Sequence, residues 1–133
     1  MNHNRGLTLV ELMVVLVVIA IAAAVGYPLY TSQVEKARRA DAQGVMMTLV
    51  NELEKHLATQ ANVGYTGFVI GDYSEHWDPI NAFYGFSLTL DGGAPFTYTI
   101  TATPPGPQSG DGCGVMSIDE LGTKTASSAN CWK

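Results

Sequence analysis

The sequence predicts an α+β fold in which one long N-terminal helix packs against a small antiparallel sheet of three or four strands. Three patterns support this: an apolar run over residues 7–30, an amphipathic helical pattern over residues 31–60, and strand-like alternation beyond residue 85. With 133 residues the chain holds at most one globular domain, which we place at residues 31–133. A domain of that size buries a limited core and needs additional stabilisation.

The first half of the predicted helix is apolar on every side. Residues 7–30 are long enough to cross a bilayer, which takes about 20 helical residues. Gly26 and Pro28 interrupt the run, and we expect a kink there because both residues weaken helical structure. Glu11 is out of place, since a charged side chain at the centre of a membrane helix costs about 2.5–3.5 kcal/mol.

The second half of the predicted helix, to about residue 59, has one apolar stripe. Apolar residues recur there at three- and four-residue spacing, namely Met46, Leu49, Val50, Leu53 and Leu57. On the polar face, the same spacing predicts ion pairs of Glu35 with Arg38 or Arg39, and of Glu52 with Lys55.

The remaining residues predict the sheet. Residues 60–85 are typical of a long loop that holds at most one short strand. Residues 86–90 and 96–102 alternate apolar and hydroxyl side chains, and the turn-forming residues 91–95 join them as a hairpin. Residues 113–119 predict a third strand, and residues 120–129 predict a turn-rich connection to the C-terminus.

Two cysteines, Cys113 and Cys131, lie near the C-terminus without the paired spacing of a zinc site. In an oxidising compartment they predict one disulfide, which for a loop of this size contributes about 3 kcal/mol. In the cytosol they would be two reduced thiols.

The charge balance disfavours a general affinity for nucleic acid. The formal net charge is −5, and without residues 1–6 six basic residues face twelve acidic ones. Lys36, Arg38 and Arg39 form a short basic cluster, which indicates a solvated or intersubunit charged face. A DNA contact is the alternative, and the rest of the domain adds only Lys55, Lys124 and Lys133.

No catalytic constellation, metal site or cofactor site is predicted. Residues 72–78 gather Asp72, Glu75, His76 and Asp78 without the spacing of an EF-hand, so a hydrated acidic loop is favoured over a calcium site. Serine, histidine and aspartate are scattered without a GxSxG motif. We therefore expect a protein that is not an enzyme.

The N-terminal stretch "RG|LTLVE", followed by the apolar run and Pro28, resembles the type IV pilin family, most closely its small type IVa minor pilins. In that family a short basic leader ends in glycine, and glutamate stands at the fifth mature position. At the first mature position the family usually has phenylalanine, and this chain has Leu7 instead. An ordinary signal peptide cut after Ala24, or a plain membrane anchor, would leave Glu11 unexplained.

The resemblance implies a leader at residues 1–6, cleavage between Gly6 and Leu7, and N-methylation of Leu7. It also implies a membrane or filament-core helix at residues 7–30, the type IV pilin fold, and a C-terminal loop closed by Cys113 and Cys131. Glu11 would pair with the new α-amino group of Leu7 in an adjoining subunit, so that subunits docked out of step leave a charge unpaired.

The implied partners are other pilin subunits, the prepilin peptidase and an inner-membrane assembly platform. The chain would be a single-pass inner-membrane protein before it enters an extracellular pilus. Two alternatives stay open: a pseudopilin of type II secretion, which typically lacks the C-terminal disulfide, and a DNA-binding competence pilin. Nucleic acid as a partner finds little support in the charge.

Overall fold

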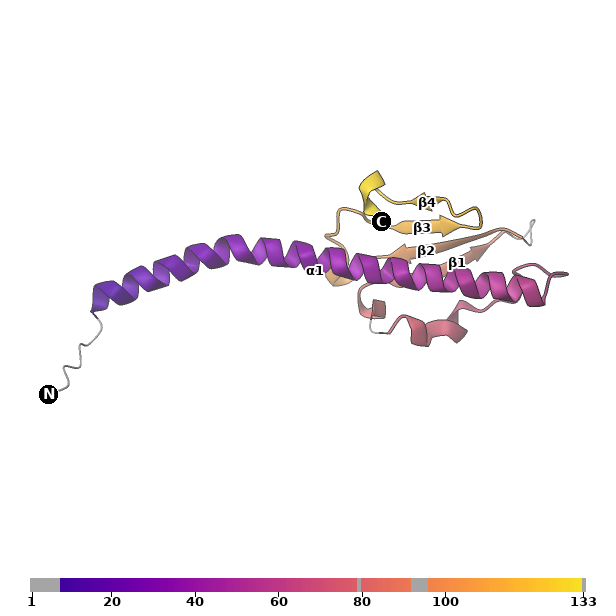
Figure 1. Ribbon diagram of the computed structural model, residues 1–133, viewed down its shortest axis with the longest axis horizontal. Helices are drawn as coiled ribbons and strands as arrows, with labels where there is room; N and C mark the ends of the chain where they lie inside the picture. The colour runs from indigo at the N-terminus through magenta and orange to yellow at the C-terminus, as the bar shows by residue number, and fades with distance from the viewer. Residues whose placement is uncertain (1–7, 79, 92–95, 133) are drawn as a thin grey trace. The chain divides into compact units, whose positions relative to one another are not determined.

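The computed structural model describes residues 8–78, 80–91 and 96–132 (Figure 1). The chain divides into two compact units, Met1–Val34 and Glu35–Lys133. Helix α1, Leu9–Thr59, begins in the first unit and ends in the second. This confirms the long helix over the described residues. Leu7, where the helix was expected to begin, lies outside them.

The first unit consists, in its described part, of α1 and the residue before it. Residues 9–34 are helical throughout, and residues 8–30 are all exposed. The apolar side chains of this unit therefore have no core of their own to fill.

The second unit contains a four-stranded antiparallel sheet in the order β1-β2-β3-β4. The strands are Gly85–Leu90, Tyr98–Thr103, Met116–Asp119 and Lys124–Thr125. β1 and β2 pair antiparallel as expected, with Gly85 opposite Thr103 and Leu90 opposite Tyr98. Residues 92–95 of the predicted turn between them lie outside the described residues. The two-residue strand β4 lies in the stretch expected to be turn-rich, and is too short to show an alternating pattern.

β3 begins at Met116, three residues later than expected, because the chain turns at residues 111–114. The Gly114 N–H donates to the Asp111 carbonyl oxygen at 3.0 Å, and Gly114 has φ +55°. Glycine adopts this left-handed conformation without a steric cost. Cys113 therefore lies in a turn and not in a strand.

The core lies between one face of the sheet and the second half of α1. Figure 1 shows this part of α1 lying along the sheet. Apolar residues of the predicted helical stripe and of alternating strand positions are fully buried there: Met46, Leu49, Leu53, Ile100 and Met116. Each such side chain contributes about 1.5–3 kcal/mol through burial.

Residues 60–84 form turns and two short 3-10 helices, η1 (Ile70–His76) and η2 (Ile80–Ala82), and no strand among the described positions. Aromatic side chains hold this segment: Phe68 stacks on Tyr73 at 4.9 Å between ring centroids, and Trp77 stacks on Phe86 at 5.4 Å. Two further 3-10 turns are Gly106–Gln108, which precedes the C-terminal loop, and Ala129–Cys131, which ends it.

Candidate functional site

The apolar surface of the first unit is the most prominent candidate site. The large apolar side chains from Leu9 to Leu29 are between 51% and 73% exposed. By length and composition, α1 is the one helix in the described part of the chain that could cross a membrane. A helix that is apolar on every side has to be covered by lipid or by other helices. This surface therefore calls for a membrane or a helical assembly.

Glu11 caps the start of α1 together with Thr8. The Glu11 carboxylate accepts hydrogen bonds from the Thr8 N–H at 3.3 Å and from the Thr8 hydroxyl at 3.2 Å, while the Glu11 N–H donates to Thr8 Oγ1 at 3.3 Å. This reciprocal pair is a capping box, in which N-cap threonine and glutamate three residues later satisfy each other's backbone N–H. The sequence motif T-x-x-E carried this signal, and the sequence analysis missed it.

The other predicted N-terminal features are only partly visible. Gly6 and Leu7, the predicted cleavage and methylation positions, lie outside the described residues. Pro28 lies inside α1, and the Thr31 hydroxyl donates to the Pro28 carbonyl oxygen at 3.0 Å. A Cβ added at Gly26 would meet nothing within 4 Å. The helix is continuous through both residues, and the kink stays a prediction.

The basic cluster of α1 separates into three different environments. Arg39 forms an ion pair with Asp111, which lies two residues before Cys113 at the base of the C-terminal loop. The guanidinium of Arg38 lies over the Phe83 ring, 3.6 Å from its centroid. Lys36 is exposed. In the described part of the chain neither Arg38 nor Arg39 forms the predicted ion pair with Glu35, whereas the Glu52–Lys55 pair is present.

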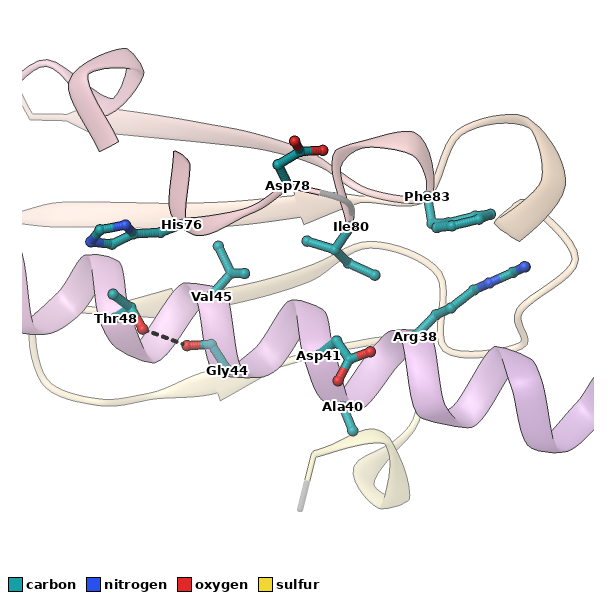
Figure 2. Close-up of a pocket in the computed structure, with 10 residues that line it drawn as sticks. All are labelled: Arg38, Ala40, Asp41, Gly44, Val45, Thr48, His76, Asp78, Ile80 and Phe83. Carbon is teal, nitrogen blue, oxygen red and sulfur yellow. Dashed lines mark hydrogen bonds between the residues drawn. The ribbon is translucent and has the colours of Figure 1, made fainter. Parts of the chain in front are cut away.

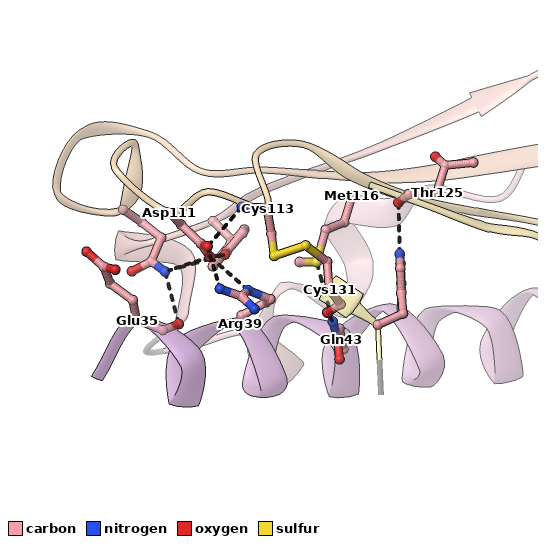
Figure 3. The surroundings of a disulfide bond; sticks show 11 residues. Glu35, Arg39, Gln43, Asp111, Cys113, Met116, Thr125 and Cys131 are labelled. Atoms are coloured by element: carbon pink, nitrogen blue, oxygen red, sulfur yellow. Dashed lines mark hydrogen bonds and ion pairs between the residues drawn. A yellow bond between two sulfur atoms is a disulfide. The ribbon is translucent and has the colours of Figure 1, made fainter. Parts of the chain in front are cut away.

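Asp111 is the centre of a buried polar network between α1 and the C-terminal loop (Figure 3). Its carboxylate accepts hydrogen bonds from Arg39 Nε at 2.9 Å, the Tyr84 hydroxyl at 2.9 Å, Gln108 Nε2 at 3.2 Å and the Cys113 N–H at 3.1 Å. The Asp111 side chain is 1% exposed. A buried carboxylate with this many donors is stabilised in its charged form.

The electrostatics of this network follow from burial and pairing. Burial alone would raise the pKa of Asp111, but the hydrogen bonds from Arg39, the Cys113 N–H and Tyr84 outweigh it and lower that pKa below its ordinary value. The hydrogen bond to Asp111 raises the pKa of Arg39. Burial and the neighbouring carboxylate raise the pKa of Tyr84 to about 12.

The predicted disulfide is confirmed. Cys113 and Cys131 are bonded, with their Cα atoms 5.6 Å apart. Gln43 of α1 donates from Nε2 to the Cys131 carbonyl oxygen at 2.6 Å (Figure 3). α1 therefore holds the disulfide at both cysteines: Gln43 bonds the Cys131 backbone directly, and Arg39 bonds Asp111, which accepts the Cys113 N–H.

The acidic segment 72–78 borders a hollow of about 510 Å³ between α1 and η1–η2 (Figure 2). Val45, Ile80 and Phe83 give it apolar walls, and Asp41 and Asp78 are its carboxylates. Within residues 8–78, 80–91 and 96–132, no three histidine, cysteine, aspartate or glutamate side chains are grouped to hold a metal ion. The walls of the hollow thus combine apolar and charged side chains.

A family model described as type IV minor pilin ComP, DNA uptake sequence receptor, matches residues 28–117. The chain belongs to this minor pilin family. A second model, the prokaryotic N-terminal methylation motif, matches residues 1–27. The two matches together cover the apolar helix and most of the globular unit of this minor pilin.

A solved structure agrees with the family. A type IV pilin from Shewanella oneidensis matches with a TM-score of 0.58 and 27% identity, over 74% of this chain and 98% of that one. No curated protein sequence matches the chain. The minor pilin thus has the type IV pilin fold: a long N-terminal helix, an antiparallel sheet and a C-terminal disulfide loop.

Proposed function

We propose that this minor pilin is cleaved between Gly6 and Leu7, methylated at Leu7 and held in the inner membrane until it is extracted into a pilus. The exposed apolar half of α1 carries this proposal, because it needs lipid before assembly and neighbouring helices afterwards. The methylation motif over residues 1–27 supports the processing step. The proposed processing and assembly require two partners, a prepilin peptidase and an inner-membrane assembly platform.

In this proposal the chain is a structural subunit and neither catalyses a reaction nor holds a cofactor. The buried polar groups support this role, since Asp111, Arg39 and Tyr84 bond one another and fasten the C-terminal loop. Their contacts stabilise the fold around the disulfide.

Top-down mass spectrometry of sheared filaments, with the membrane fraction alongside, tests the proposal. We expect a filament species that begins at methylated Leu7 with Cys113 and Cys131 oxidised. A Gly6→Val variant is the control and should keep residues 1–6 and stay in the membrane. The processed species confined to membranes would indicate a pseudopilin-like role, and a chain beginning at Val25 would contradict the processing proposed here.

DNA binding is a second candidate function, favoured by the description of the family whose model covers residues 28–117. The second unit has six basic and eleven acidic residues, a net charge of −5, so binding would depend on a local patch. Lys36 and Arg38 on α1 could contribute to it, since Lys36 is exposed and Arg38 is half-buried over an aromatic ring.

Titration of the full chain in detergent micelles with duplex DNA at several salt concentrations tests this candidate. We expect the logarithm of the DNA-binding constant to fall linearly with the logarithm of the salt concentration. Lys36→Ala should make that slope shallower by about 1, which corresponds to the loss of one phosphate contact. Lys55→Ala, which removes a lysine paired with Glu52, is the control. Equal losses from both variants, or no salt dependence, would exclude a DNA site at Lys36.

A further inference from the structure

Both halves of the disulfide are held from the same face of α1. Gln43 donates directly to the Cys131 carbonyl oxygen at 2.6 Å. Arg39, one helical turn earlier, binds Asp111, and the Asp111 carboxylate accepts the Cys113 N–H at 3.1 Å. Residues four apart lie on one side of a helix. One helical turn therefore fixes the backbone position of both cysteines (Figure 3).

These contacts depend on the C-terminal loop being docked. Gln43 and Asp111 are both buried. Gln43 Nε2 also lies 3.5 Å from Met116 Sδ. With the loop undocked, Arg39 and Gln43 would lose these partners, and the loop would lose its anchors. Docking is thus favoured by polar contacts that do not require the sulfur–sulfur bond itself.

We propose that α1 is a template for this disulfide: the loop docks through Asp111 and the Cys131 carbonyl, and docking brings the two thiols together for oxidation. The reaction needs a disulfide oxidant. One cysteine thiolate attacks that disulfide and releases one reduced thiol, and the second cysteine thiolate then attacks the mixed disulfide and releases the other. Two protons and two electrons leave the protein. The template favours the second step, the intramolecular attack on the mixed disulfide, because docking holds the two cysteines close together.

The template has a measurable consequence for the equilibrium. Contacts that hold the cysteines together raise the effective concentration of one thiol towards the other. A net hydrogen bond corresponds to about a two- to tenfold change in an equilibrium constant, and a bond to a buried charge to more. Gln43 and Asp111 are therefore positioning residues for ring closure.

Oxidation of the reduced full chain in detergent micelles tests this inference, with glutathione and glutathione disulfide as the redox buffer and acid trapping of the products. We expect Gln43→Leu to lower the effective concentration about two- to tenfold and Asp111→Asn to lower it by about tenfold or more. In both variants the mixed disulfide with glutathione should accumulate, because its formation is unchanged while ring closure is slowed. Gln33→Leu and Asp41→Asn, at exposed residues of α1, are the matched controls.

Circular dichroism separates a positioning effect from loss of the fold, since each variant should keep its helix and sheet signal. Unchanged effective concentrations in well-folded Gln43→Leu and Asp111→Asn chains would overturn the template. A second measurement needs no variant and follows the Cys113 amide, which donates to Asp111. If docking favours the bond, the bond must favour docking by the same factor, so reduction of the natural chain should speed hydrogen exchange at this amide without abolishing its protection. Equal protection in the oxidised and reduced chains, or no protection in the reduced chain, would also overturn the template.

Discussion

Asp111 shows how single residues set the stability of the second unit. It connects α1 through Arg39, the approach to β1 through Tyr84 and the disulfide loop through the Cys113 N–H. Because its side chain is 1% exposed, removing its charge leaves Arg39 without a buried partner. Breaking a buried pair from one side is more costly than the pair's net contribution to stability.

Asp111→Asn should therefore lower the free energy of unfolding by about 3 kcal/mol at neutral pH. The pKa of Asp111 is lowered in the folded chain, so its contribution is fully present above the unfolded pKa of about 4 and is lost as pH falls through the folded pKa. Thermal unfolding in micelles, followed by near-ultraviolet circular dichroism from pH 6 to pH 2, measures both effects. Asp41→Asn is the control, and an equal acid dependence in natural and Asp111→Asn chains would contradict this role.

At the scale of the element, α1 has two halves with different requirements. From Leu9 to Leu29 its apolar side chains face outwards, whereas Met46, Leu49 and Leu53 are fully buried in the second unit. Gly26 stands near the end of the exposed half, and apart from the adjoining backbone of α1 no described atom lies within 4 Å of an added Cβ there. Packing within the described chain therefore does not require glycine at this position.

Gly26→Ala should leave the isolated chain folded and stabilise its helix by about 1 kcal/mol, through the higher helix propensity of alanine. If assembly requires local loosening near Gly26 and Pro28, the same change should lower the yield of this subunit in sheared filaments. Gly44→Ala is the matched control, since Gly44 also lies on α1 with room for a Cβ. Full incorporation of the Gly26→Ala chain would show that no loosening is needed at this position.

At the scale of the whole molecule, we propose that Glu11 has a further role towards neighbouring subunits. Within one chain its carboxylate caps α1 through Thr8. In the type IV pilus assembly proposed above, the charge would also fix the register of the subunit by pairing with the α-amino group of Leu7 in a neighbour. The two roles separate cleanly, because a neutral glutamine can replace glutamate in a capping box but cannot form an ion pair.

Glu11→Gln should consequently insert in the membrane and keep its helix start, but enter filaments poorly, as should Glu11→Val. Thr8→Ala is the comparison, since it removes the hydroxyl cap, worth about 1 kcal/mol, and keeps the charge. Immunoblots of sheared filaments against membrane fractions measure the outcome. Normal incorporation of Glu11→Gln, with loss in Thr8→Ala, would assign Glu11 to capping alone.

Local patterns were sufficient to predict the long helix, the β1–β2 hairpin and the disulfide pair. Helical and strand periodicities depend only on residues close together in the sequence. They place apolar side chains on one face of an element, and that face is buried whichever other element packs against it. Two cysteines allow one intramolecular pairing, so the bond between Cys113 and Cys131 could be predicted once the chain was placed in an oxidising compartment. Glu11 was recognised as exceptional for the same reason, since one charge interrupts a continuous apolar run.

The partners of the polar residues depend on contacts between distant parts of the chain. Arg39 has Glu35 at helical spacing, yet it binds Asp111, 72 positions along the chain, because the folded loop brings a buried carboxylate to it. Gln43 showed no signal in the sequence, and its role follows from the Cys131 carbonyl oxygen that lies over it. Local spacing determines which side chains can share a face, whereas contacts between distant segments depend on how the loop closes on the helix. The fold is thus determined largely by periodicity, and the network around the disulfide by long-range packing.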